Sequence, residues 1–325
     1  MKIAGLIFFY LLVHTLLFAQ SFQGVTGMAD TSFTNYSAFI NTKKTHPGIE
    51  EVKEFKFADV LAKKNIAYCK IANRVLKLDA FYPKNKSEKA GIAIVFIHGG
   101  GWRSGNRTQH YPLAQKLASL GYTCFTPEYR LSTEALFPAA VYDIKAVVRW
   151  VRKNAVKYNI DTLKIVVAGF SAGGELAAFT GTTANMPLFE GLNCNRQMLS
   201  QVSAIVDIDG TLSFVHPESG EGDDSKKTSA ATHWFGYSKK NNFQLWQAAS
   251  PLSYVNNNTP PTLFINSAVT KMHAGRDDFI KILNENNVYS EVHTFEGAPH
   301  SFCLFKPWFQ TTVNYIDDFL KKIFK

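Results

Sequence analysis

Residues 165–174 constrain the fold of this chain more than any other segment. They read IVVAGFSAGG, an apolar run typical of a buried strand, followed by a turn with glycines on both sides of Ser171. Gly169 and Gly173 leave room for a tight strand-to-helix turn, and the frame matches G-x-S-x-G, a pattern in which such a turn carries a nucleophilic serine. Because a serine hydroxyl is a weak nucleophile, a site of this kind also needs a base and amide donors for an oxyanion.

Strands and helices alternate through the rest of the chain. The apolar patterns predict strands over residues 66–70, 75–82, 92–97, 122–127, 164–168, 203–209, 262–266 and 290–295, and helices over 111–120, 137–158, 173–180, 276–286 and 308–324. The first two strands alternate apolar and polar residues, as an antiparallel pair with one wet face does. The later alternation predicts an α/β fold with a doubly wound, mostly parallel sheet and helices on both faces.

The N-terminus resembles a secretory signal peptide over residues 1–20. Lys2 precedes a mostly apolar run over residues 3–18, and the polar Ser21 follows shortly after it. A membrane anchor is the competing interpretation, but the run is short for a span. We therefore expect export to the periplasm or the extracellular space, with no stable membrane span once the signal is removed.

The length and composition allow one large domain after this signal. The chain has 325 residues, of which 46% are hydrophobic, enough for a buried core. Residues 21–65 are polar and lack periodicity, which indicates an N-terminal lead segment, and the main domain would cover residues 66–325. Within it, residues 210–238 form a polar excursion, and long irregular excursions usually serve as lids or binding loops.

Charge and cysteines exclude several classes of function. The net charge of +9 is spread without a dense basic run, so it favours solubility or acidic partners such as uronic-acid polysaccharides, and not nucleic acid. The four cysteines lack C-x-x-C spacing, so no metal site is expected; they are Cys69, Cys124, Cys194 and Cys303. Export would permit a disulfide of unknown pairing, but buried free thiols are the default expectation. No feature indicates a particular oligomeric state.

A second glycine-rich element follows the predicted strand 92–97. Residues 98–102 read HGGGW, and three glycines let backbone amides approach a ligand closely. A flexible turn is the simpler explanation. In this position, however, the element matches an oxyanion loop, and we expect the amides of Gly100, Gly101 and Ala172 to stabilise a negative oxygen.

The base of such a site should follow the nucleophile in the chain, after the last strand. His300 does so, within the loop EGAPHSF at residues 296–302. Among nine histidines, His273 is the only other serious candidate, and His98 belongs to the glycine loop.

Together these motifs resemble the α/β-hydrolase superfamily of esterases and lipases. The resemblance covers residues 73–325 and is strongest to bacterial carbohydrate esterases of the feruloyl, acetylxylan and pectin-esterase-like kind. It also includes EYRL at 128–131, FPAA at 137–140 with Asp143, ASP at 249–251 and PP at 260–261. Residues 66–325 would then be a hydrolase catalytic domain.

The resemblance implies a secreted serine esterase without a cofactor. Ser171 would be acylated, His300 would act as base, and the substrate would be a short acyl (acetyl) or methyl ester on a cell-wall polysaccharide such as pectin or xylan. A general short-chain carboxylesterase or lipase acting on a small ester, or an exopeptidase of the same fold, is an alternative. A non-catalytic binding protein on a hydrolase fold is another.

The acid that orients the histidine does not carry over from these relatives. An aspartate usually follows the penultimate strand in a G-x-x-D turn, but here residues 266–270 read NSAVT and Thr270 takes that place. Any carboxylate that reaches His300 Nδ1 would serve. Asp209 is the first choice, because it ends the strand 203–209 at the sheet edge where ligands bind. Three later carboxylates are alternatives: Asp277, Asp278 and Glu296. The absence of such an acid is a further alternative.

Three residues are candidates for substrate binding. Trp102 could stack on a sugar face, although large aromatics pack more often in the core. His273 and Arg276 could lie at the mouth of the site, where an arginine suits a uronate carboxylate. Local pairing of Arg276 with Asp277 is an equally good explanation.

Overall fold

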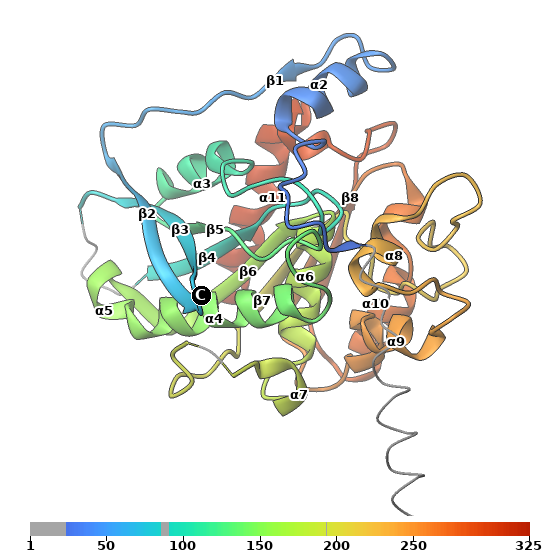
Figure 1. Ribbon diagram of the computed structural model, residues 1–325. Helices are drawn as coiled ribbons and strands as arrows, with labels where there is room; N and C mark the ends of the chain where they lie inside the picture. The colour runs from blue at the N-terminus through green and yellow to red at the C-terminus, as the bar shows by residue number, and fades with distance from the viewer. Residues whose placement is uncertain (1–23, 86–90, 193) are drawn as a thin grey trace, which may run out of the picture.

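The protein is built around an eight-stranded sheet (Figure 1). The computed structural model describes residues 24–85, 91–192 and 194–325, so the expected signal peptide lies outside the described residues. In sheet order the strands are β2 (Val60–Ile71), β3 (Arg74–Pro83), β5 (Thr123–Pro127), β4 (Gly91–Ile97), β6 (Ile160–Phe170), β7 (Ala204–Ile208), β8 (Thr262–Asn266) and β9 (Ser290–Thr294). Strand β3 runs antiparallel to β2 and β5, whereas β4 to β9 run parallel to one another, so the carboxyl ends of β4 to β9 meet at one edge.

Helices cover both faces of this sheet (Figure 1). The hydrophobic cluster on one face includes residues of α2 (Asn35–Lys43), α3 (Tyr111–Ala118) and α11 (Trp308–Ile323). The cluster on the other face includes residues of α4 (Ala139–Lys153), α5 (Ala155–Tyr158), α6 (Ala172–Thr182), α7 (Pro187–Glu190), α8 (Ala230–Phe235), α9 (Phe243–Ala248) and α10 (Arg276–Glu285). In the part of the chain that the structure describes, no helix is long and apolar enough to cross a membrane.

The central strand β4 shows why the sheet is buried on both sides. Ile94 and Phe96 belong to the hydrophobic cluster under α3 and α11, whereas Val95 and Ile97 belong to the cluster under α4 and α6. Successive side chains of a strand point to opposite faces, so a strand between two helix layers is apolar throughout. The expected fold class, a doubly wound and mostly parallel sheet with helices on both faces, is confirmed.

Three predicted elements differ clearly in extent from the structure. The strand predicted over 164–168 is longer, because β6 runs from Ile160 to Phe170. The helix predicted over 137–158 is divided. Its first part, α4, ends at Lys153, where the backbone N–H and the side-chain Nδ2 of Asn154 both donate to the carbonyl of Trp150 (3.0 and 2.8 Å), and α5 begins at Ala155. Strand β2 begins at Val60 and so crosses position 65, where the sequence places the end of the lead segment. The first half of β2 is exposed and contains lysines, so its sequence does not show the alternation of apolar and polar residues by which the strand could be predicted.

The lead segment and the excursion are both more ordered than their sequences indicate. The lead segment contains α2, whose Thr34 and Ser37 form a reciprocal capping box, and β1 (Glu50–Glu51), which pairs with β10 (Phe305–Lys306). The excursion at 210–238 contains α8 and buries Phe214 and Trp234 in the core. Buried aromatic side chains therefore order the excursion, although its sequence has no apolar periodicity.

A disulfide joins Cys69 of β2 to Cys194, 125 residues later in the chain. The default expectation of buried free thiols is therefore wrong for this pair, because spacing carries no information about contacts between distant segments. Cys124 and Cys303 are free and buried, and burial raises the pKa of both thiols.

Removing this disulfide should destabilise the protein. We expect the double variant Cys69→Ala/Cys194→Ala to lose about 2–4 kcal/mol of unfolding free energy, because the unfolded chain regains the freedom of a long loop. Urea denaturation followed by circular dichroism measures the loss. Dithiothreitol should shift the urea midpoint of the wild type towards that of the double variant and leave the midpoint of the variant unchanged. If dithiothreitol does not change the wild-type midpoint, the disulfide is not present.

Candidate active site

Ser171 stands at the junction of β6 and α6 with a strained backbone. Its φ of 57° and ψ of −122° fall where non-glycine residues are rare, and such a conformation costs on the order of 1–3 kcal/mol. A Cβ at Gly169 would overlap the carbonyl oxygen of Gly173, and one at Gly173 would overlap that of Ile97. The Ser171 amide donates to the Ile208 carbonyl of β7 (2.9 Å), which holds the turn on the sheet edge.

A chain of hydrogen bonds connects Ser171 to Asp209 through His300. His300 lies in the loop after β9, its Nε2 is 2.8 Å from Ser171 Oγ, and its Nδ1 is 2.7 Å from Asp209 Oδ2. The imidazole also packs against the ring of Phe170, with centroids 4.8 Å apart. With Nδ1 donating to the carboxylate, Nε2 is left as an acceptor for the serine proton.

Asp209 is fully buried and has hydrogen-bond donors on both oxygens. It follows β7, and Ser267 donates to it from the backbone N–H (2.9 Å) and from Oγ (2.5 Å). His273 Nδ1 lies 3.3 Å from Oδ1. Burial alone would raise the pKa of Asp209, but the hydrogen bonds from His273, His300 and Ser267 hold it at about 2, so the carboxyl is ionised.

The other carboxylates considered for this role lie elsewhere. Asp277 is exposed and pairs with Arg276 (2.8 Å), and Asp278 is exposed with Oδ2 3.4 Å from His216 Nε2. Glu296 is exposed on its turn. The structure brings Asp209 to His300, and among the described residues none of the three alternatives forms a hydrogen bond or ion pair with His300.

The glycine loop lies directly beside Ser171. A Cβ at Gly99 would be 3.1 Å from Ser171 Cβ, and Gly100 and Gly101 have φ values of 122° and 59°. Ala172 is the first residue of α6, where a helix has free N–H groups. Among the described residues, no hydrogen bond uses the N–H of Gly100, Gly101 or Ala172, so all three can donate to a ligand oxygen.

His98, the first residue of the glycine loop at 98–102, stabilises the loop through the contacts of its side chain. It is buried, its Nδ1 lies 2.9 Å from the Gly99 carbonyl oxygen, and its ring stacks on Tyr129 with centroids 4.4 Å apart. Burial lowers the pKa of His98 to about 4 despite the Gly99 carbonyl, so this histidine is neutral at pH 7.

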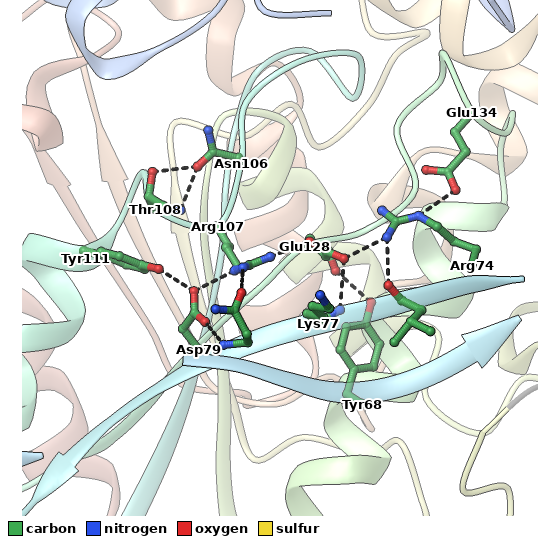
Figure 2. A network of polar contacts seen from close by, with 12 residues as sticks. Tyr68, Arg74, Lys77, Asp79, Asn106, Arg107, Thr108, Tyr111, Glu128 and Glu134 are labelled. Carbon is green, nitrogen blue, oxygen red and sulfur yellow. Dashed lines mark hydrogen bonds and ion pairs between the residues drawn. The ribbon is translucent and has the colours of Figure 1, made fainter. Parts of the chain in front are cut away.

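An ion-pair network ties the same loop to the edge of the sheet (Figure 2). Arg107 donates from Nε to Asp79 Oδ2 and from Nη1 to Glu128 Oε2, both at 2.6 Å. Arg74 joins Glu128 and Glu134, each at 2.9 Å. The sequence does not indicate this network, because its members come from three separate segments: β3, the loop at Arg107 and residues 128–134.

Trp102 is not available for stacking on a sugar, which corrects the sequence prediction. Its side chain is buried, its Nε1 donates to Glu175 Oε2 (2.9 Å), and it stacks on Trp234 with centroids 4.7 Å apart. The 210–238 excursion folds over it. Trp234 and Trp246 are buried as well.

The two remaining candidates for substrate binding make local contacts. His273 is 6% exposed and faces Asp209, so it supports the carboxylate and does not occupy an open mouth. Arg276 donates to Asn266 Oδ1 and to Asp277, each at 2.9 Å, which is the local pairing left open by the sequence. Within the described ranges, no group of three or more histidine, cysteine, aspartate or glutamate side chains could hold a metal ion.

Ser267 and His273 are partners of Asp209 that sequence analysis missed in this role. Ser267 lies in the turn at 266–270 that lacks the expected aspartate. The presence of Thr270 where relatives have an aspartate was the only signal in the sequence, and it did not identify which side chains contact Asp209.

Comparison with known proteins places the chain among esterases. A family model described as BD-FAE matches residues 78–274. Esterase LipC of Mycobacterium tuberculosis is 28% identical over 63% of this chain and 49% of its own length, so the chain spans about half of that relative. An esterase of Thermogutta terrifontis solved with butyrate bound is 27% identical, with a TM-score of 0.66 over 82% of this chain and 95% of the other. A truncated carbohydrate esterase from gut microbiota shares the fold, with a TM-score of 0.68 and 23% identity over 84% of this chain and 100% of the other.

Proposed function

Because the chain belongs to the BD-FAE family of α/β-hydrolase esterases, we propose that it is a serine esterase with Ser171 as nucleophile, His300 as general base and Asp209 as the acid. One observation carries this proposal: Ser171 Oγ, the His300 imidazole and Asp209 form a continuous hydrogen-bonded chain with distances of 2.8 and 2.7 Å. Nucleophile, base and orienting carboxylate in this geometry are what acyl transfer requires.

In the first half of the reaction Ser171 becomes acylated. Its Oγ attacks the ester carbonyl carbon while His300 Nε2 takes the hydroxyl proton, and the carbonyl oxygen becomes an oxyanion that the amides of Gly100, Gly101 and Ala172 stabilise. When this intermediate collapses, the bond to the leaving oxygen breaks and His300 returns the proton to that oxygen, so an alcohol leaves. Throughout these steps Asp209 stabilises the imidazolium.

Water completes the cycle in the second half. His300 removes a proton from a water molecule, and the hydroxyl attacks the acyl carbon of the acyl-enzyme. A second oxyanion forms in the same hole and collapses with release of the acid and return of the proton to Ser171 Oγ. The reaction needs no cofactor.

We further propose that the substrate is a short acyl (acetyl) or methyl ester on a cell-wall polysaccharide such as pectin or xylan. The support is the sequence resemblance to carbohydrate esterases and the net charge of +9, which favours acidic polymers. The signal-like residues 1–20 support export, and so does the Cys69–Cys194 disulfide, because disulfides persist in oxidising compartments.

A panel of esters tests this function. We expect acetate or methanol release from at least one of acetylated xylan, acetylated pectin and methylated pectin, with the two products measured separately, and acetate release from p-nitrophenyl acetate. Hydrolysis of p-nitrophenyl acetate with indifference to all three polymers would instead indicate a general carboxylesterase. Inactivity on every ester would leave a non-catalytic binding protein on this fold.

A further inference from the structure

The N-terminal strap, defined here as residues 24–54, precedes the region that the family model matches. In Figure 1 it is the blue segment that runs from beside α8 to α2 and β1 near α11. It crosses the molecule near both loops that carry the proposed oxyanion amides and the proposed base. Its polar contacts with those loops fall into three groups.

The first group fixes the start of the strap to the glycine loop. Arg103 donates from Nε to Asp30 Oδ2 (2.9 Å) and from Nη1 to the Gly24 carbonyl (3.1 Å). Arg103 belongs to the same turn as the proposed oxyanion residues, since its N–H donates to the Gly100 carbonyl (3.2 Å). At Gly24 a Cβ would overlap the carbonyl oxygen of His233 in α8, so the strap also packs closely against the excursion.

The second group reaches the glycine loop from its other end. Asn35 Nδ2 donates to the Gln109 carbonyl (3.1 Å). The side chain of the same Gln109 accepts from the Gly99 N–H (2.7 Å). Two hydrogen bonds through Gln109 thus connect Asn35 of the strap to the backbone of Gly99, which lies beside Ser171.

The third group holds the loop that carries His300. Thr42 Oγ1 lies 3.0 Å from the hydroxyl of Ser301, the residue after His300, and His46 Nε2 lies 3.0 Å from the Gly297 carbonyl oxygen. Further along, Val52 donates to the Leu304 carbonyl (3.3 Å), and β1 pairs with β10. The strap therefore contacts this loop on both sides of the imidazole.

These contacts bear on the two parts of the site that the sheet does not hold rigidly. Ser171 sits between β6 and α6, but His300 and the glycine amides lie on loops, which open more easily than strands and helices. Acyl transfer tolerates little displacement of either group, and a shift of about 1 Å can cost on the order of 100-fold in rate.

We propose that the N-terminal strap is a positioning element that sets the glycine loop and the His300 loop against Ser171. The proposal rests on the serine-esterase function given above. It assigns to Asp30, Thr42 and His46 an effect on turnover, although none of them belongs to the proposed catalytic group.

A triple variant tests the proposal with little change in side-chain shape. In Asp30→Asn/Thr42→Val/His46→Phe, we expect kcat per titrated active site to fall about 10- to 100-fold with KM within about twofold. Active sites are counted with a chromogenic organophosphate, so misfolded molecules do not contribute. The control is Tyr36→Phe/Lys44→Gln, which alters exposed strap residues, and it should behave as the wild type. Restoring Thr42 in the triple variant should recover part of kcat.

Hydrogen exchange provides a readout that does not depend on turnover. Peptides covering residues 98–110 and 295–306 should exchange faster in the triple variant than in the wild type and the control. If wild-type protein hydrolyses no ester, the proposed function fails, and this exchange measurement still decides the role of the strap. A lower melting temperature with unchanged kcat per titrated site, or unchanged exchange in both loops, would overturn the proposal.

Discussion

Replacing Ser171 by alanine should lower kcat for p-nitrophenyl acetate by about 10⁵- to 10⁶-fold. The change removes only Oγ, the atom 2.8 Å from His300 Nε2. Alanine accepts a positive φ no more easily than serine does, so the local strain at φ 57° stays the same in both proteins. Steady-state kinetics measure the loss, and mass spectrometry after organophosphate treatment should find an adduct on the wild type alone.

The matched control for this experiment is Ser253→Ala. Ser253 is an exposed serine whose hydroxyl donates to the Gln247 carbonyl (2.8 Å), and its loss should leave activity within about twofold. A Ser171→Ala protein that turns over at the wild-type rate would exclude Ser171 as the nucleophile.

The framework of the site could be predicted from sequence because it depends on local patterns. Continuous apolar runs identify β4 and β6, since a strand between two helix layers has no wet face. The glycines around Ser171 predict the turn, because no side chain fits at Gly169 or Gly173. The position of Asp209 at the end of β7 follows from the rule that parallel strands present their carboxyl ends at one edge.

What could not be predicted depends on contacts between distant segments. The Cys69–Cys194 disulfide, the burial of Trp102 under α8 and the contacts of Ser267 and His273 with Asp209 all join residues far apart in the chain, and periodicity reports none of them. The contacts of the N-terminal strap could not be predicted for the same reason. Its polar sequence indicates only a lead segment, whereas its contacts are set by Arg103, Gln109 and Ser301 in the loops it crosses.

Replacing Asp209 by asparagine should lower kcat/KM by about 10³- to 10⁴-fold. Asp209 accepts hydrogen bonds from His300 Nδ1 (2.7 Å) and from Ser267. A neutral amide no longer stabilises the imidazolium, and if its NH₂ faces Nδ1 the ring takes the tautomer in which Nε2 carries the proton. That tautomer cannot accept a proton from Ser171.

The control variants are the carboxylates that the sequence left open. Asp277→Asn, Asp278→Asn and Glu296→Gln change exposed side chains and should each retain activity within about twofold. A loss of several orders of magnitude in any of these three, with Asp209→Asn near the wild type, would show that another carboxylate orients His300.

The pH dependence of stability provides a second measure of the same group. The pKa of Asp209 falls from 3.8 to about 2 on folding, so its ionised form stabilises the native state at pH values above 3.8. This contribution is lost as the pH falls towards 2, because the native carboxyl then becomes protonated as well. The difference in unfolding free energy between wild type and Asp209→Asn should therefore narrow as the pH falls below about 4. A difference that stays constant down to about pH 2 would show that the hydrogen bonds from Ser267, His273 and His300 do not stabilise the charge on Asp209.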